Sequence, residues 1–295
     1  MSLPRTIIGV CAYNEENNIR HLLQNLVSEQ SLPDNCKILV ICSGCTDKTP
    51  QVVEEFHVKD EKIEPIIEKT RNGKAAALNK IFQIAKDSAD VLILVNADAL
   101  PQSGTVKLLI SQLMKSKSGA TFAQPVPFRG PKGVCYKIVG VIWQLHHLIS
   151  TQQRPKLSGE LCAIRTSCLQ PIPENIATDE PYIELAIHKQ GYSILYFPQA
   201  VVHIRCPTNI VDLLKQRKRI WVGHMQLQKA TGHKVSTSNF RNILRMASAL
   251  KPSEIFYAAI GGCLELIAYS QANIESRKGT IPYAWEPIRS TKTSI

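Results

Sequence analysis

A carboxylate follows a short hydrophobic run near residue 98. Five aliphatic residues, Val91–Val95, lead directly into Asn96-Ala97-Asp98, and Pro101 follows soon after. Such a run is typical of a strand buried on both faces, and open α/β sheets bind ligands at the carboxyl ends of their strands. Because hard oxygen atoms bind Mg²⁺ or Mn²⁺ beside phosphate, Asp98 is a candidate metal ligand. The alternative is a polar turn that only ends the strand.

Polar segments also follow two other predicted strands, at residues 11–15 and 43–49. A further segment, Arg71-Asn72-Gly73-Lys74, opens a predicted helix with two cations, which suits a diphosphate. In a parallel sheet these segments share one edge with the residues around position 98, which predicts a nucleoside-diphosphate site with a metal. The candidate donor-binding residues are Ala12, Tyr13, Asn14, Glu15, Ser43, Arg71, Lys74, Asn96, Ala97 and Asp98.

The composition indicates a globular chain with an anionic partner. A chain of 295 residues with 44% hydrophobic content predicts one large domain, or one domain with a helical extension. The net charge of +11 suits nucleic acid, anionic lipid or phosphorylated small molecules. We do not expect a nucleic-acid binder, because no recognition motif is present and 6% aromatic residues provide few stacking platforms.

The nine cysteines indicate a reducing, cytoplasmic setting, because they are scattered through apolar segments and no signal peptide opens the chain. Cys42 and Cys45 have C-x-x-C spacing, but without a second pair or paired histidines we do not expect a zinc site. We also expect no membrane span, because the apolar run 255–264 reaches about half the required length.

The hydrophobic pattern predicts the elements that position these residues. In the first half, strands alternate with helices, which predicts a mostly parallel sheet with both faces covered. We predict strands at 6–11, 37–42, 62–67 and 91–95, and helices at 50–56, 74–86 and 106–114, with one more capped by Asn14. In the second half we predict a loop at 171–181, strands at 193–197 and 201–204, and helices at 135–152, 182–189, 210–229 and 254–270.

Together these segments resemble the family-two glycosyltransferases. The resemblance rests on Cys-Ala-Tyr-Asn-Glu at 11–15, the turn at 43–49, Arg-Asn-Gly-Lys-Ala-Ala-Ala-Leu-Asn at 71–79, the triplet at 96–98, the acid pair at 179–180 and Gln-Arg-Lys-Arg-Ile-Trp at 216–221. It implies an α/β GT-A fold over residues 1–230, with a donor-binding half to about 125 and an acceptor-binding half beyond. Residues 231–295 would form a C-terminal helical extension and polar tail.

The resemblance implies an inverting, hexosyltransferase-like enzyme that uses Mg²⁺ or Mn²⁺ and a UDP- or GDP-sugar donor. Either Glu180 or Asp179 would take the proton of the acceptor hydroxyl. Asp98 would bind the metal together with His203, and the metal would neutralise the leaving diphosphate. The residues expected to face the diphosphate or the acceptor are Gln216, Arg219 and Trp221.

The chain departs from the family pattern at several positions. Ser43 stands where the family often has a base-contacting Asp, and Asn96 replaces the first Asp of the D-x-D motif. The acid pair reads Asp-Glu rather than Glu-Asp, and Ile220 is inserted before Trp221. These departures motivate the alternative of a sugar-nucleotide-binding protein without transferase activity.

Two apolar helices, at 135–152 and 254–270, give a basic protein surfaces that suit attachment to anionic lipid. One hypothesis is therefore peripheral association with the inner face of the membrane and a lipid-linked or polysaccharide acceptor. The alternative is that both helices pack against the sheet or a second subunit.

Overall fold

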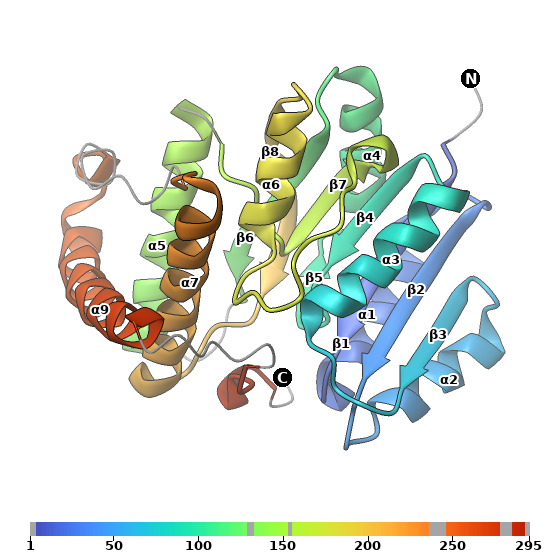
Figure 1. The fold of residues 1–295 in the computed structure, drawn as a ribbon, viewed down its shortest axis with the longest axis horizontal. Coiled ribbons are helices and arrows are strands. Elements are labelled where there is room, and N and C mark those ends of the chain that lie inside the picture. The colour runs from blue at the N-terminus through green and yellow to red at the C-terminus, as the bar shows by residue number, and fades with distance from the viewer. Residues whose placement is uncertain (1–3, 129–132, 153–154, 236–245, 278–284, 293–295) are drawn as a thin grey trace.

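The computed structural model describes residues 4–128, 133–152, 155–235, 246–277 and 285–292. Its centre is an eight-stranded sheet with the order β3-β2-β1-β4-β7-β6-β8-β5 (Figure 1). The strands are β1 (Thr6–Ala12), β2 (Cys36–Ser43), β3 (Ile63–Glu68), β4 (Val91–Val95), β5 (Ala99–Pro101), β6 (Ala120–Pro127), β7 (Leu161–Arg165) and β8 (Ile194–Ile204). The helices are α1 (Glu16–Glu29), α2 (Thr49–Lys59), α3 (Lys74–Ser88), α4 (Thr105–Lys115), α5 (Val134–Gln152), α6 (Glu180–Lys189), α7 (Ile210–Thr231) and α9 (Pro252–Arg277).

The first half of the sheet is parallel, as predicted. β1 lies between β2 and β4, and β2 also pairs with β3. The carboxyl ends of these strands therefore meet at one edge, which brings together the segments that follow them. The predicted α/β class with a mostly parallel sheet and C-terminal helices is confirmed.

The second half of the sheet contains antiparallel strands that the sequence analysis missed. β7 runs antiparallel to β4 and β6, and β5 runs antiparallel to β8. Pro101, which follows the predicted strand 91–95, is the last residue of β5 at the sheet's edge, where a missing amide is tolerated. The predicted strands at 193–197 and 201–204 form one strand, β8, with an irregular register opposite Ala123 and Gln124.

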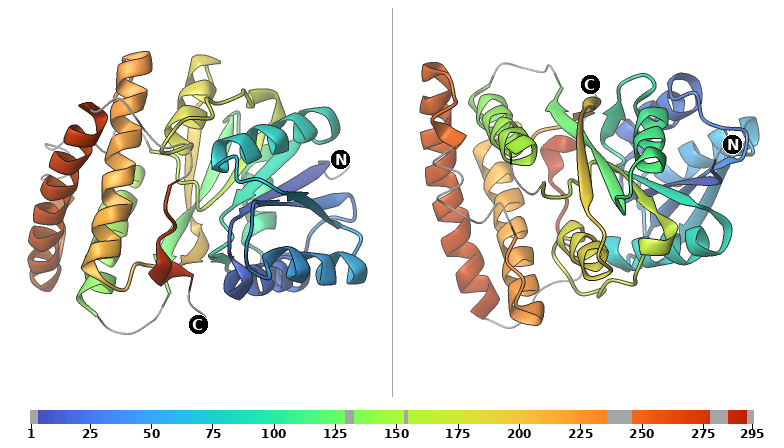
Figure 2. Two further views of the ribbon diagram at one scale, coloured as in Figure 1. Left: turned by 60° about the horizontal axis from the view of Figure 1, so that its bottom comes forward. Right: turned by 90° about the horizontal axis from the view of Figure 1, so that it is seen from above.

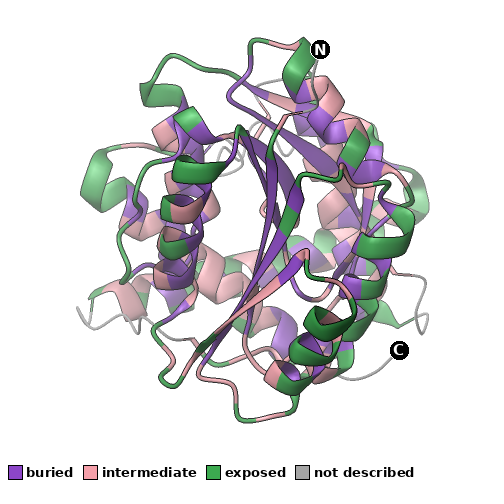
Figure 3. Ribbon diagram, turned by 90° about the vertical axis from the view of Figure 1, so that its right-hand side faces the viewer, coloured by how far each residue is buried: buried purple, intermediate pink, exposed green. Residues whose placement is uncertain are grey.

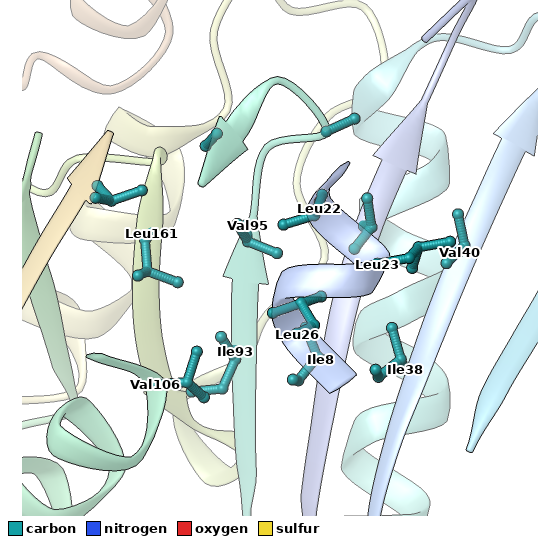
Figure 4. Close-up of a cluster of buried hydrophobic side chains, with 14 of the residues drawn as sticks. Ile8, Leu22, Leu23, Leu26, Ile38, Val40, Ile93, Val95, Val106 and Leu161 are labelled. Carbon is teal, nitrogen blue, oxygen red and sulfur yellow. The ribbon is translucent and has the colours of Figure 1, made fainter. Parts of the chain in front are cut away.

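The core lies in two layers because successive residues of a strand face opposite sides of the sheet. Ile8, Val40 and Ile93 face α1, α2 and α4, while Leu39 and Leu92 face α3 and α6. Figure 3 shows the central strands as almost wholly buried. Figure 4 shows the first layer, where three leucines of α1 pack on the strands; full burial of each stabilises the fold by roughly 1.5–3 kcal/mol.

Helices α5, α7 and α9 form a separate layer beside the sheet (Figure 2). We predicted that no segment could span a membrane, but by length and composition helix α9 could do so. α9 has a window of mean hydropathy 1.2, only 17% of which is buried. We underestimated this helix because Glu265 interrupts the apolar run; its carboxylate forms an ion pair with Arg217 of α7. In the described ranges α9 is the one helix that meets these criteria.

Candidate functional site

The turns after β1 and β2 are tied together through Asn14. Its side chain accepts from the Thr46 amide at 2.8 Å and donates to the Thr46 hydroxyl at 3.0 Å. The φ angle of Asn14 is 52°, in the left-handed region that Asn tolerates better than most residues. We predicted that Asn14 caps the following helix; this was wrong, because Glu15 occupies the N-cap position and Asn14 instead links two turns.

The loop after β3 packs on the turn after β2. Gly44 has a φ of +62°, and a Cβ atom there would lie 2.5 Å from the Arg71 backbone nitrogen. The Ser43 hydroxyl accepts from the Asn72 amide at 3.3 Å. The Arg71 guanidinium lies 3.8 Å from the centre of the Tyr13 ring, a cation–π contact. The structure therefore brings the predicted residues of three segments to one edge.

A line of polar side chains connects the end of β4 with the acid pair. The Lys74 ammonium lies 3.1 Å from an Asp179 carboxylate oxygen and donates to the Asn96 side-chain oxygen at 3.2 Å. Asn96 in turn donates to a Glu160 carboxylate oxygen at 2.8 Å. Burial would lower the pKa of Lys74, but Asp179 and Glu180 outweigh it and raise that pKa above its usual value.

This line explains the departure from the D-x-D pattern. An amide at position 96 accepts from Lys74 and donates to Glu160 at the same time, whereas an ionised Asp would only accept. Glu160 was missed by the sequence analysis. It directly precedes the apolar strand β7, as Asn96 directly follows β4, and these two strands are antiparallel. The only local signal for Glu160 in the sequence was its position as a polar residue next to an apolar run.

Asp98 lies in a cluster of acidic groups. Burial raises the pKa of Asp98, and burial together with the Asp98 charge raises the pKa of Glu15. Burial, Asp98 and Glu180 raise the pKa of Glu160 to about 7. The Lys292 ammonium forms an ion pair with Glu15 and counteracts the shift at Asp98. Carboxylate oxygens such as that of Asp98 are the ligands that Mg²⁺ and related divalent ions prefer.

The predicted second metal ligand, His203, lies on β8 opposite Leu100 of β5. Its ring is 5.5 Å from the Phe128 ring. The positive charge of Arg205, two residues further on, interacts with the carboxyl groups of Asp98 and Glu15. Within the described ranges, no three histidine, cysteine, aspartate or glutamate side chains gather around one point for a metal. Ligation by His203 stays a prediction.

The acid pair begins helix α6. Asp179 is the N-cap residue and is 5% exposed, and Glu180 is the first helical residue, two residues earlier than we predicted. Both benefit from the positive end of the helix dipole. Glu180 lines a narrow pocket together with Lys74 and Asn96. Gly159 packs closely against Glu180, because a Cβ atom added to Gly159 would lie 2.5 Å from the Cγ of Glu180.

The side chains of the basic segment of α7 contact two different parts of the molecule. Arg219 donates to the Ala177 carbonyl at 2.9 Å, two residues before the acid pair. Trp221 instead donates to Glu265 at 2.7 Å and packs on Tyr269, both on α9. The inserted Ile220 moves Trp221 one position along the helix, which turns its side chain by about 100°. That Trp221 faces the diphosphate or the acceptor stays a prediction.

Two further candidates are alanines near strand ends. Ala12 ends β1, and Ala97 is buried in the turn after β4. Gln216 is half-buried on α7. All nine cysteines, including Cys42 and Cys45, are free thiols.

The chain is similar in sequence to known glycosyltransferases. The family model Glycosyl transferase family 2 matches residues 7–169, more than half of the chain. A probable glycosyltransferase, YdaM, of Bacillus subtilis is 26% identical over 74% of this chain and 54% of its own length. A poly-β-1,6-N-acetyl-D-glucosamine synthase of Staphylococcus aureus is 24% identical over 80% of this chain and 58% of its own length. The matched region thus spans little more than half of these relatives.

Solved structures share the fold. The mannosyltransferase PcManGT from Pyrobaculum calidifontis, in complex with GDP-Man and Mn²⁺, superposes with a TM-score of 0.63 at 21% identity, covering 98% of this chain and 83% of that one. TarS 1–349 of Staphylococcus aureus, in complex with UDP-GlcNAc, gives a TM-score of 0.53 at 14% identity, covering 94% and 92%. Both are likenesses of fold.

Proposed function

Since this chain belongs to glycosyltransferase family 2, we propose that it transfers a sugar from a UDP- or GDP-sugar to an acceptor hydroxyl with inversion at the anomeric carbon. The observation that carries the proposal is the line of contacts from Asp179 through Lys74 and Asn96 to Glu160, beside Asp98. It joins the donor edge of the sheet to the acid pair. A donor and an acceptor can therefore be held next to one carboxylate.

Glu180 is our choice for the base. Asp179 is 5% exposed and committed to Lys74, whereas Glu180 makes no ion pair in the described part of the chain. Its carboxylate would take the acceptor hydroxyl's proton as the oxygen attacks the anomeric carbon and the bond to the diphosphate breaks. Lys74 and Arg219 add positive charge close to this point.

A divalent metal fits the acidic cluster. Asp98 would hold it, with His203 as the second predicted ligand. Burial and the charge of Asp98 raise the pKa of the nearby Glu15 carboxyl. When bound, such a metal neutralises the negative charge of the leaving diphosphate. The complex of PcManGT with GDP-Man and Mn²⁺ supports this choice of ion.

The test is turnover of UDP- and GDP-sugars with Mn²⁺, including slow hydrolysis when no acceptor is known. Glu180→Gln should abolish turnover and retain nucleotide binding, while Asp98→Asn should lose the dependence on Mn²⁺. Exposed Lys107→Met, on α4, is the matched control and should behave as wild type. Tight sugar-nucleotide binding without any turnover would instead support the alternative of a binding protein. Unchanged turnover in both site variants would contradict the assignment.

We further propose a polysaccharide or lipid-linked acceptor and peripheral attachment to the inner membrane face from the cytoplasm. The outer face of α9 supports this, because Phe256, Leu266 and Ile274 are more than half exposed. Such a face in a chain of net charge +11 suits anionic lipid. Wild type should float with anionic vesicles, and the variant Phe256→Ser/Leu266→Ser should not. No flotation of the wild type would reject membrane attachment.

A further inference from the structure

The last described segment of the chain, Trp285–Lys292, crosses the donor edge of the sheet, and we name it the C-terminal strap (Figure 2). Arg71, Asn17 and Asn18 donate to its backbone carbonyls at 2.5, 2.9 and 3.1 Å. Asp212, at the start of α7, accepts from one of its backbone amides at 3.1 Å. The strap is therefore bound on one side by the donor half and on the other by the helical layer.

The strap places a lysine ammonium at the carboxyl end of β1. Lys292 donates to the carbonyls of Tyr13 and Asn14 at 2.6 and 3.1 Å and forms an ion pair with Glu15. The Lys292 side chain is 20% exposed and that of Glu15 is 12% exposed, so the pair is mostly buried. The ammonium charge also acts on Asp98, the predicted metal ligand.

A cavity of about 740 Å³ lies between the strap and the β1–α1 edge. Tyr13 and Asn17 line it on one side, and Lys215 of α7 lines it on another. The strap contributes Arg289 and Lys292, together with Glu286. Three cations and one acid make the cavity a site for an anion, and its volume lies within the usual range for small-molecule pockets.

We propose that the strap is a wall of the donor site and that Lys292 binds the diphosphate of the sugar nucleotide. An ammonium has three donors, and here it already sits among oxygens beside the residue predicted to hold the metal. A phosphate oxygen is a stronger acceptor for it than a backbone carbonyl. This inference rests on the proposed function, because it assigns a further residue to the same donor.

The experiment measures the dissociation constants of UDP and GDP by calorimetry, with and without Mn²⁺. Lys292→Met should weaken binding of the preferred nucleotide about tenfold to a hundredfold, the usual effect of losing a hydrogen bond to a charged group. The loss should persist without Mn²⁺, because the ammonium acts on the phosphates directly. Lys107→Met should bind as wild type.

A second comparison separates phosphate binding from a merely structural role. A Glu15→Gln background removes the ion pair of Lys292, so adding Lys292→Met should still weaken nucleotide binding if the ammonium contacts the diphosphate. Equal affinities of Glu15→Gln and the double variant would overturn the inference, and so would tighter binding by Lys292→Met, which would make the strap a competitor of the donor. If the wild type binds neither nucleotide, the proposed function itself fails.

Discussion

The ion pair between Lys74 and Asp179 provides a quantitative test of the site, through the substitution Lys74→Met. The methionine retains the length of the apolar stem and removes the charge. The side chains of Lys74 and Asp179 are 31% and 7% exposed, so the carboxylate would remain in a mostly buried place without its cation. Asn96 would also lose a donor.

The expected magnitude follows from the geometry. At 3.1 Å and an effective dielectric constant of about 20, the attraction between the two charges is about 5 kcal/mol before desolvation. Breaking a buried pair on one side costs about 3–5 kcal/mol. Because almost a third of Lys74 is exposed, we expect the lower end, about 3 kcal/mol, which for a chain of this size lowers the Tm by roughly 6–12 °C.

The assay is urea unfolding of Lys74→Met, Asp179→Asn and the double variant. The double variant should recover much of the loss, because no unpaired charge remains buried. Arg20→Met is the matched control, since Arg20 and Glu55 are closer, at 2.7 Å, but about half exposed, and its midpoint should hardly change. A Lys74→Met variant as stable as Arg20→Met, or a double variant less stable than either single one, would refute the reasoning.

Three further predictions concern the edge of the site. Gly159→Ala should reduce turnover at least tenfold with little change in nucleotide affinity, because its methyl group would displace the Glu180 carboxylate; kinetics and calorimetry on the same sample check this. Gly44→Ala should weaken nucleotide binding and lower the unfolding midpoint, because the new Cβ would meet the Arg71 backbone at a positive φ. The pKa of Glu160 is about 7 in the folded state, so the folded chain retains a proton that the unfolded chain loses near pH 4.5. The unfolding free energy should therefore fall by up to about 3 kcal/mol between pH 4.5 and pH 8. Glu160→Gln should make the unfolding free energy less dependent on pH, as measured by urea titrations at several pH values.

The parallel half of the fold was predictable because its signals are local. Val91–Val95 is apolar on both faces, and the helices that follow β1, β2 and β3 have clear apolar stripes. Strands β6 and β7 were missed for the opposite reason. Both lie in mixed segments of the second half, and β7 is ordered by pairing with β4, some 70 residues earlier in the chain. A strand defined mainly by long-range pairing has no strong pattern of its own.

The prediction of site residues divides in the same way. Residues that follow strands, such as Lys74 and Asp98, could be predicted for one edge because the carboxyl ends of parallel strands meet there. The hydrogen bond of Trp221 to Glu265 of α9 was not predicted, because it depends on how two helices pack. The division of the chain at residue 230 into a transferase domain and an extension stays a prediction.

The sequence by itself determined the α/β class, the family and the edge of the sheet where the donor would bind. These features depend on hydrophobic periodicity and on motifs, both of which involve residues close together in the sequence. The tertiary structure alone decided the partners of those residues. In the folded chain Asn96 forms hydrogen bonds with both Lys74 and Glu160. Lys292 forms an ion pair with Glu15, although the two residues lie near opposite ends of the sequence. Such contacts depend on how the folded chain closes in space, and the surrounding sequence carries no periodic signal for them.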